Sequence, residues 1–292
     1  SRTPFRISFL GGGTDYPAWY MEHGGAVLAT TINKYCYLTC RYLPPFFEHR
    51  YRVVWSKIEN CHTIDEITHP AVRAILQYMN CDRGVEIHHD GDLPARSGTG
   101  SSSAFAVGLL NAMHALEGRM AGKRDLAEQA LHIEQDVLQD NVGSQDQVMA
   151  AHGGLNKVDF LPGGQITVTP LALSRDRIRA LESHMMLFYT GLTRTASNIV
   201  ETYIGTLDQK HRQLTAMTDL VNEGFNVLNS DADLSEFGKL LHENWLVKRE
   251  LGEKISNGHV DEIYAEARDA GAIGGKLSGA GGGGFMNLFV PP

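Results

Sequence analysis

Hydrophobic and polar residues alternate along much of the first third of the chain, which predicts strands there. Residues 5–10 alternate in this way and stop at three glycines. Four further runs are rich in β-branched, aromatic and apolar side chains, the composition that strands favour. These predicted strands are 26–31, 35–41, 51–55 and 85–89.

The middle of the chain changes to a helical period. Residues 103–116 and 124–138 carry apolar side chains three and four positions apart, so that each segment has one apolar stripe. A shorter helix is predicted over 144–151, with Ser144 as its N-cap and Gly153 at its end.

Strands and helices are mixed in the last part of the chain. The predicted strands are 155–160, 165–169, 185–189 and 285–290, and the predicted helices are 195–203, 234–251 and 260–270. The composition changes near Leu171. We therefore expect two domains, 1–170 and 171–292.

Composition excludes several classes of protein. The 292 residues are 42% hydrophobic and 21% charged, which is ordinary globular usage, and the formal net charge of -8 disfavours nucleic acid as a partner. No apolar run reaches the roughly 20 residues that a membrane helix needs. None of the four cysteines forms a CxxC pair, so we expect free thiols and a cytoplasmic protein.

A loop rich in glycine and serine precedes the helix at 103–116. Its residues are Pro94, Ala95, Arg96, Ser97, Gly98, Thr99, Gly100, Ser101, Ser102 and Ser103. Glycines let backbone N–H groups face an anion, and the helix N-terminus adds unpaired donors and partial positive charge. Serine is also a good helix cap without any ligand. Three successive serines after Gly-x-Gly favour phosphate binding over a simple cap.

Two familiar nucleotide motifs do not fit the sequence. Gly275-Lys276 lacks the first glycine and the following Ser or Thr of the P-loop. Tyr16 stands where the third glycine of a Rossmann motif belongs. The predicted phosphate loop therefore belongs to neither the P-loop nor the Rossmann class of nucleotide-binding motifs.

Two carboxylates are candidates for chemistry. Glu134 lies within an apolar stripe, where a carboxylate is costly unless it is paired or binds metal, so Mg²⁺ ligation and a salt bridge both fit. Asp146 lies in the first turn of the helix at 144–151. The helix dipole favours an acid there, and a catalytic base fits equally well.

A second glycine run, 276–284, connects a helix to a predicted strand. Such a run permits close packing onto another loop, and it also suits a mobile linker. The apolar segment that follows, 285–290, has the composition of a core strand, which argues against a linker.

Taken together, three segments resemble the motifs of the GHMP kinase family, in the same order. They are the strand and turn 4–16, the Pro-x-x-x-Gly-Leu-Gly-Ser-Ser loop at 94–102 with Thr99 in the leucine place, and the glycine run 276–284. The resemblance covers nearly the whole chain. It implies an α+β fold with an N-terminal ribosomal-protein-S5-domain-2-like domain and a C-terminal ferredoxin-like domain, and an active site between them.

The resemblance also implies roles for single residues, with ATP and Mg²⁺ as cofactors. Ser102 and Glu134 match metal ligands, Asp146 matches the acid at the acceptor hydroxyl, and Arg6 lies near the reacting group. Other residues are implied to bind the substrate. Those placed near the sugar are Gly12, Gly13, Thr14, Asp15, Gly281 and Gly282, and those that could bind a remote phosphate are Arg194 and Lys34.

Within the family, the first motif is similar to that of the D-glycero-D-manno-heptose 7-phosphate kinases, which phosphorylate the anomeric O1. The implied partners are a nucleotide and a small sugar or sugar phosphate. Kinases of free sugars such as fucose or galactose, a non-catalytic sensor and a related decarboxylase are the alternatives. The family usually continues beyond the last glycine-rich strand, so we expect the sequence to be truncated at Pro292.

Overall fold

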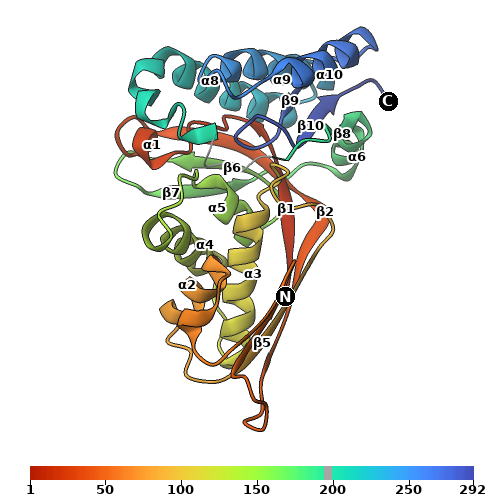
Figure 1. Ribbon diagram of the computed structural model, residues 1–292. Helices are drawn as coiled ribbons and strands as arrows, with labels where there is room; N and C mark the ends of the chain where they lie inside the picture. The colour runs from red at the N-terminus through yellow and green to blue at the C-terminus, as the bar shows by residue number, and fades with distance from the viewer. Residues whose placement is uncertain (194–198) are drawn as a thin grey trace.

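The computed structural model describes residues 1–193 and 199–292, and it contains a large sheet and a small one with helices around them (Figure 1). The large sheet has seven strands in the order β4-β3-β5-β2-β6-β7, with β1 paired to β2. Its strands are β1 (Arg2–Leu10), β2 (Gly25–Tyr42), β3 (Tyr51–Val54), β4 (Ile58–Cys61), β5 (Val85–Gly91), β6 (Leu155–Phe160) and β7 (Ile166–Pro170).

The large sheet is organised around β2, a strand of 18 residues. On one edge it pairs with β1, and on the other edge it pairs first with β6 and then, further along, with β5. The two separate strands predicted at 26–31 and 35–41 are thus one strand. The register with β1 shifts between Pro4 and Arg6, and this irregularity accommodates the polar residues between the two predicted runs.

Helices cover one face of the large sheet. The long α3 packs against β2, and α2, α4 and α5 lie beside it (Figure 1). Their apolar side chains, among them Leu109 and Met113 of α3, form one core with Leu38 of β2. The bounds are α1 (Pro17–His23), α2 (Pro70–Tyr78), α3 (Ser101–Leu116), α4 (Lys123–Leu131) and α5 (Gln145–His152), with a 3₁₀ turn at Ile64–Glu66.

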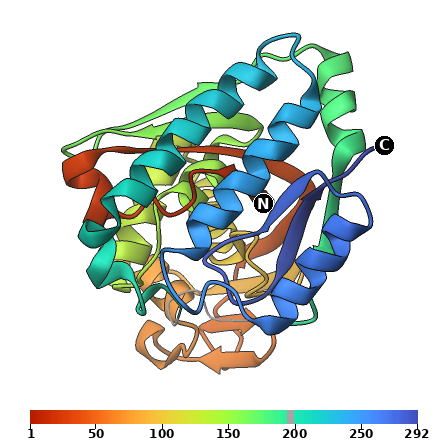
Figure 2. The same cartoon turned by 90° about the horizontal axis from the view of Figure 1, so that it is seen from above.

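The second half of the chain covers the other face of β1 and the start of β2. Figure 2 shows α8 and α9 side by side above the sheet. Phe9 of β1 contacts Phe237 of α9 edge to face, with ring centroids 5.4 Å apart. The elements here are α6 (Arg175–His184), β8 (Met185–Tyr189), a 3₁₀ helix at Ile204–Lys210, α8 (His211–Leu228), α9 (Leu234–Arg249), α10 (Gly258–Asp269), β9 (Gly274–Leu277) and β10 (Phe285–Phe289).

Strands β8, β10 and β9 form the small antiparallel sheet in that order. The expected domain boundary falls between the end of β7 at Pro170 and the start of α6 at Arg175. One apolar core nevertheless joins β1 and β2 to α8 and α9. The division at residue 170 stays a prediction. No helix of the described ranges is long and apolar enough to cross a bilayer.

Two predicted helices differ from the structure. The helix at 124–138 is α4 followed by a π-helical segment, His132–Val137. The helix predicted at 195–203 falls partly outside the described residues; only Ile199 and Val200 are helical, and turns follow. The sequence prediction missed α1, α2, α6 and α8. In α8 the signal was present, because Leu214, Met217 and Val221 repeat at helical spacing and are buried.

The two glycine-rich loops meet backbone against backbone. A Cβ atom on Gly98 would lie 2.4 Å from the Ser278 carbonyl oxygen, and one on Gly284 would lie 2.3 Å from that of Ser97. The Phe285 N–H donates to the same Ser97 oxygen at 3.1 Å. The run 276–284 is therefore a packed loop, as its position before a buried strand predicted.

This packing predicts that Gly284→Ala destabilises the protein more than a Gly→Ala change at a position where the positive φ is strained but the added Cβ meets no neighbouring atom. Gly271 is a matched control, because its φ of +105° resembles the +100° of Gly284 and an added Cβ meets nothing within 4 Å. Both changes cost roughly 1–2 kcal/mol for the positive φ, and Gly284→Ala adds about 1–3 kcal/mol of overpacking. Thermal unfolding measures the difference, and equal melting temperatures would contradict the packing argument.

Candidate active site

A cavity of about 270 Å³ lies where the two halves of the chain meet. The end of β1, the N-termini of α3 and α5, the side of α9 and the loop before β10 all contribute to its wall. The lining residues are Arg6, Gly12, Gly13, Asp15, Tyr16, Arg96, Gly98, Gly100, Ser101, Ser102, Ser103, Asp140, Asn141, Val142, Gly143, Gln145, Asp146, Tyr203, Lys248, Ser278, Gly279, Ala280, Gly281 and Gly283.

The glycine-serine loop leads directly into α3. Gly98 and Gly100 have φ of +80° and +71°, a left-handed conformation that glycine adopts without strain. The hydroxyls of Ser97 and Thr99 lie 3.1 Å apart and are buried, so these two side chains hold the loop from behind. Ser101 begins the helix, and its first turn presents unpaired N–H groups to the cavity.

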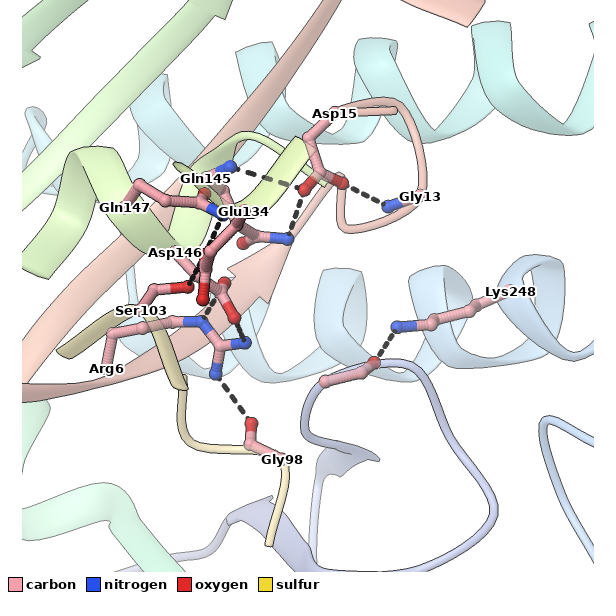
Figure 3. Close-up of polar contacts among 11 residues, drawn as sticks. Arg6, Gly13, Asp15, Gly98, Ser103, Glu134, Gln145, Asp146, Gln147 and Lys248 are labelled. Atoms are coloured by element: carbon pink, nitrogen blue, oxygen red, sulfur yellow. Dashed lines mark hydrogen bonds and ion pairs between the residues drawn. The ribbon is translucent and has the colours of Figure 1, made fainter. Parts of the chain in front are cut away.

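Glu134 reaches this helix end from the π-helical segment (Figure 3). Its carboxylate accepts hydrogen bonds from Ser102 Oγ at 2.6 Å, from Ser103 Oγ at 2.7 Å and from the Gln147 side-chain amide. Burial raises the pKa of Glu134 to about 6, although these three donors act to lower it. A buried acid beside two hydroxyls at a helix N-terminus suits a cation or a phosphate-bound metal.

Arg6 and Asp146 form a bidentate ion pair in the cavity wall (Figure 3). Arg6 Nε and Nη2 each donate to one oxygen of Asp146 at 2.6 Å. Arg6 Nη1 donates to the Gly98 carbonyl oxygen, also at 2.6 Å. The guanidinium thus connects the first turn of α5 to the glycine-serine loop and fixes the orientation of both.

Asp15 is held rigidly on the other side of α5. It accepts hydrogen bonds from the Gly13 N–H at 2.8 Å and from Gln145 Nε2 at 2.9 Å. Burial is the main cause that raises the pKa of Asp15, and the nearby charge of Asp146 adds to it. The side chain is 2% exposed and lines the cavity, so its carboxylate is placed to bind a polar group there.

The structure does not bring all the expected residues to the cavity. Expected residues that do not line it include Thr14, Pro94, Ser97, Thr99 and Glu134. Thr14 is fully buried and donates its hydroxyl to backbone oxygens, and Pro94 is exposed. Ser97, Thr99 and Glu134 are buried as well, and Glu134 accepts hydrogen bonds from Ser102 and Ser103, which do line the cavity. Gly281 lines the cavity, whereas Gly282 uses its N–H on the Ile255 carbonyl.

The two basic residues expected at a remote phosphate are not placed at the cavity either. Arg194 lies outside the described residues. Lys34 is exposed on β2 and does not line the cavity. The substrate roles assigned to these positions from the resemblance remain predictions.

Several residues at the site were not predicted, and three of them make hydrogen bonds that define it. Gln145 and Gln147 orient Asp15 and Glu134, and Lys248 of α9 points into the cavity and donates to the Gly279 carbonyl oxygen at 2.5 Å. The two glutamines flank Asp146 in the motif 143–147, so their position was a usable signal. No local pattern marks Lys248, because its helix meets the cavity only through tertiary packing.

Comparison with known proteins identifies the family. The model of the GHMP kinases N terminal domain matches residues 66–154, and that of the GHMP kinases C terminal region matches 226–291. The chain belongs to the GHMP kinase family. The expected fold class and phosphotransferase activity are therefore confirmed, and ATP is the phosphate donor in this family.

Individual relatives of this GHMP kinase match over its whole length. A D-glycero-alpha-D-manno-heptose 7-phosphate kinase of Campylobacter jejuni is 29% identical over 100% of the chain and 89% of its own length. The solved structure of a D-glycero-D-manno-heptose 1-phosphate kinase of Bacteroides thetaiotaomicron is 26% identical, with a TM-score of 0.80 over 100% of this chain and 88% of that one.

Other relatives act on different substrates by their names. A bifunctional fucokinase/GDP-fucose pyrophosphorylase of Arabidopsis thaliana is 26% identical over 98% of the chain, which spans only 29% of that protein. The structure of Lactococcus lactis galactokinase complexed with galactose has a TM-score of 0.75 at 16% identity over 99% of this chain and 84% of that one, which shows the shared fold.

The residues present fit the nucleotide and metal that a GHMP kinase uses. The residues Gly98, Gly100 and Ser101 to Ser103 line the cavity, and the first turn of α3, which begins at Ser101, has unpaired N–H groups that suit phosphate oxygens. Glu134 is a buried carboxylate that accepts from Ser102, and Mg²⁺ is commonly held by one or two protein carboxylates together with substrate phosphates. Such a site needs no larger group of acidic ligands, and the described ranges contain none.

The raised pKa of Glu134 predicts a distinct pH dependence of stability in EDTA. The folded carboxyl has a pKa of about 6 against an ordinary value of 4.5, so the folded state binds more protons between these values. The free energy of unfolding therefore falls as pH rises from 4.5 to 6, by about 2 kcal/mol. In Glu134→Gln this fall in the free energy of unfolding should be absent, because the side-chain amide does not titrate. Melting temperatures of the two proteins should diverge from pH 4.5 to 7, and parallel curves would refute the argument.

Proposed function

We propose that this GHMP kinase transfers the γ-phosphoryl group of ATP to the anomeric O1 of a sugar phosphate, D-glycero-D-manno-heptose 7-phosphate. The observation that carries the proposal is the Arg6–Asp146 pair, which lines the same cavity as Ser102, the serine whose hydroxyl donates to the buried Glu134 carboxylate. Full-length similarity to two heptose phosphate kinases supports the choice of sugar.

The donor half of the site is the loop 98–103 with the N-terminus of α3. Its backbone N–H groups bind the triphosphate and neutralise part of its charge. Ser102 Oγ and the Glu134 carboxylate would hold Mg²⁺, which would neutralise charge on the phosphate oxygens. Ser103 and Gln147 keep the Glu134 carboxylate in place through their hydrogen bonds.

The acceptor half is formed by Asp146, Arg6 and Asp15. Asp146 aligns the attacking hydroxyl and accepts its proton, while Arg6 stabilises charge on the transferred group. Asp15 accepts hydrogen bonds from sugar hydroxyls. An anomeric hydroxyl is more acidic than an ordinary alcohol, so alignment by Asp146 contributes more than its basicity.

The alternatives are a kinase of a free sugar, a sensor without catalysis, and a decarboxylase. The names of the two heptose phosphate kinases also differ: the Campylobacter jejuni protein is named for heptose 7-phosphate, and the Bacteroides thetaiotaomicron structure for heptose 1-phosphate. The sensor is disfavoured because Ser102, Glu134 and Asp146 are all present and in contact with polar partners. Dependence on ATP is consistent with action in the cytoplasm.

A panel of acceptors tests the substrate. With ATP and Mg²⁺ we expect ADP release with heptose 7-phosphate, and far less with free heptose, fucose, galactose or mevalonate. Phosphorus NMR of the product should show a second phosphate on the anomeric carbon. Equal rates with free sugars, or a phosphate added elsewhere, would overturn the assignment. ATP binding without turnover of any acceptor would favour the sensor.

The role of Asp146 predicts a partial loss of activity. Asp146→Asn keeps an oxygen for alignment and removes the base, so we expect kcat to fall about 100-fold, near the lower end for general bases. The change Asp176→Asn, at a side chain that is 95% exposed on α6, is the matched control. A normal kcat for Asp146→Asn in steady-state assays would show that the residue serves only the helix.

A further inference from the structure

Lys248 is an unusual cation in the cavity wall. It is 3% exposed, and among the described residues it makes no ion pair. Lysine is almost never fully buried without a charged partner. Its ammonium has three N–H donors, and the one assigned contact is the Gly279 carbonyl oxygen. The remaining donors are available to a ligand in the cavity.

The position of Lys248 is on the acceptor side of the cavity. A Cβ atom on Gly12 would lie 3.7 Å from Lys248 Nζ and 3.4 Å from Gln145 Nε2, the group that donates to Asp15. Lys248 therefore borders the turn that carries Asp15. In Figure 3 Lys248 lies apart from Glu134 and Ser103, and the dashed line from its amine is the hydrogen bond to the Gly279 carbonyl oxygen.

Two buried groups beside Lys248 lack protein partners. Ser278 is fully buried and lines the cavity, and its hydroxyl has no hydrogen-bond partner among the described residues. Lys276, two residues earlier on β9, is also fully buried, and its amine is equally unpartnered in that part of the chain. Buried polar groups without partners are costly, so a ligand that satisfies them binds favourably.

Lys248 carries a positive charge at neutral pH, which favours an anionic ligand. Burial lowers the pKa of Lys248 to about 8, and Asp15 and Asp146 act in the opposite direction. The group is therefore mainly protonated at neutral pH. Lys276 adds a second amine, whose pKa burial holds well below its usual value.

We propose that Lys248, assisted by the Ser278 hydroxyl, binds the phosphate that the acceptor already carries. The ligand class is a phosphate monoester on a sugar whose reacting hydroxyl lies at Asp146. The inference rests on the function proposed above and adds the residue that distinguishes a sugar phosphate from a free sugar. Lys248 replaces Lys34 in this role, because Lys34 is exposed and away from the cavity.

The competing ligand for Lys248 is the nucleotide. The lining cation on the nucleotide side is Arg96, an exposed residue that precedes Gly98 in the loop. Lys248 comes from α9, donates to the Gly279 carbonyl oxygen and lies next to Gly12 in the turn that carries Asp15. A substitution of Lys248 should therefore affect the acceptor and leave the affinity for ATP unchanged.

Steady-state kinetics with two acceptors test the proposal. In Lys248→Met, KM for heptose 7-phosphate should rise roughly 10- to 100-fold, as for the loss of a charged hydrogen bond. KM for ATP and kcat/KM for free heptose should not change. Lys248→Arg should restore part of the affinity for the sugar phosphate. Lys239→Met is the matched control, because Lys239 lies on the same helix with 59% of its side chain exposed.

Each other outcome has a definite meaning. An equal loss with both acceptors, or a higher KM for ATP, would overturn the role of Lys248. If wild type used free heptose as well as the phosphate, the proposed function would fail instead. Should Lys248→Met not fold, Ser278→Ala must raise KM for the sugar phosphate selectively, and inorganic phosphate must compete with the sugar phosphate in wild type. Absence of both effects refutes the proposal.

Discussion

The active site depends on the close approach of two backbone segments that are far apart in the sequence. The loop at 97–98 touches the loop at 278–284 so closely that a Cβ on Gly98 or Gly284 would overlap a carbonyl oxygen. The strand β10 begins with a hydrogen bond to the first of these loops. This contact places the helix N-terminus of α3 and the wall supplied by α9 on either side of one cavity.

Within the cavity, nearly every buried charge has a fixed partner. Arg6 holds Asp146 with two hydrogen bonds, Glu134 accepts three, and Asp15 is fixed by a backbone N–H and an amide. Charges that are already oriented in a region of low dielectric constant stabilise a transition state without further reorganisation. Lys276, beside the cavity, has no partner among the described residues, and Lys248 is the other exception, with a backbone carbonyl as its assigned partner. This difference is why it suits a ligand.

Irregular backbone brings two of these side chains into position. Arg6 lies next to the register shift between β1 and β2, and bulges of this kind redirect a side chain. Glu134 lies in a π-helical segment, in which it is 1% exposed while Val137 is 46% exposed. A regular helix would place both on the predicted apolar stripe. Local period alone therefore identified Glu134 as a candidate without showing how it becomes buried.

The sequence by itself determined the motifs, their order, and most of the helices and strands. Even α8, one of the helices that the prediction missed, is visible in the spacing of Leu214, Met217 and Val221, because helix period and turn chemistry act over only a few residues. Only the tertiary structure decided that the Thr14 hydroxyl donates to backbone oxygens, that Gln145 hydrogen-bonds to Asp15 and that Lys248 lines the cavity. Such contacts depend on which distant segments pack together, and the spacing of residues within one segment does not determine its distant packing partners.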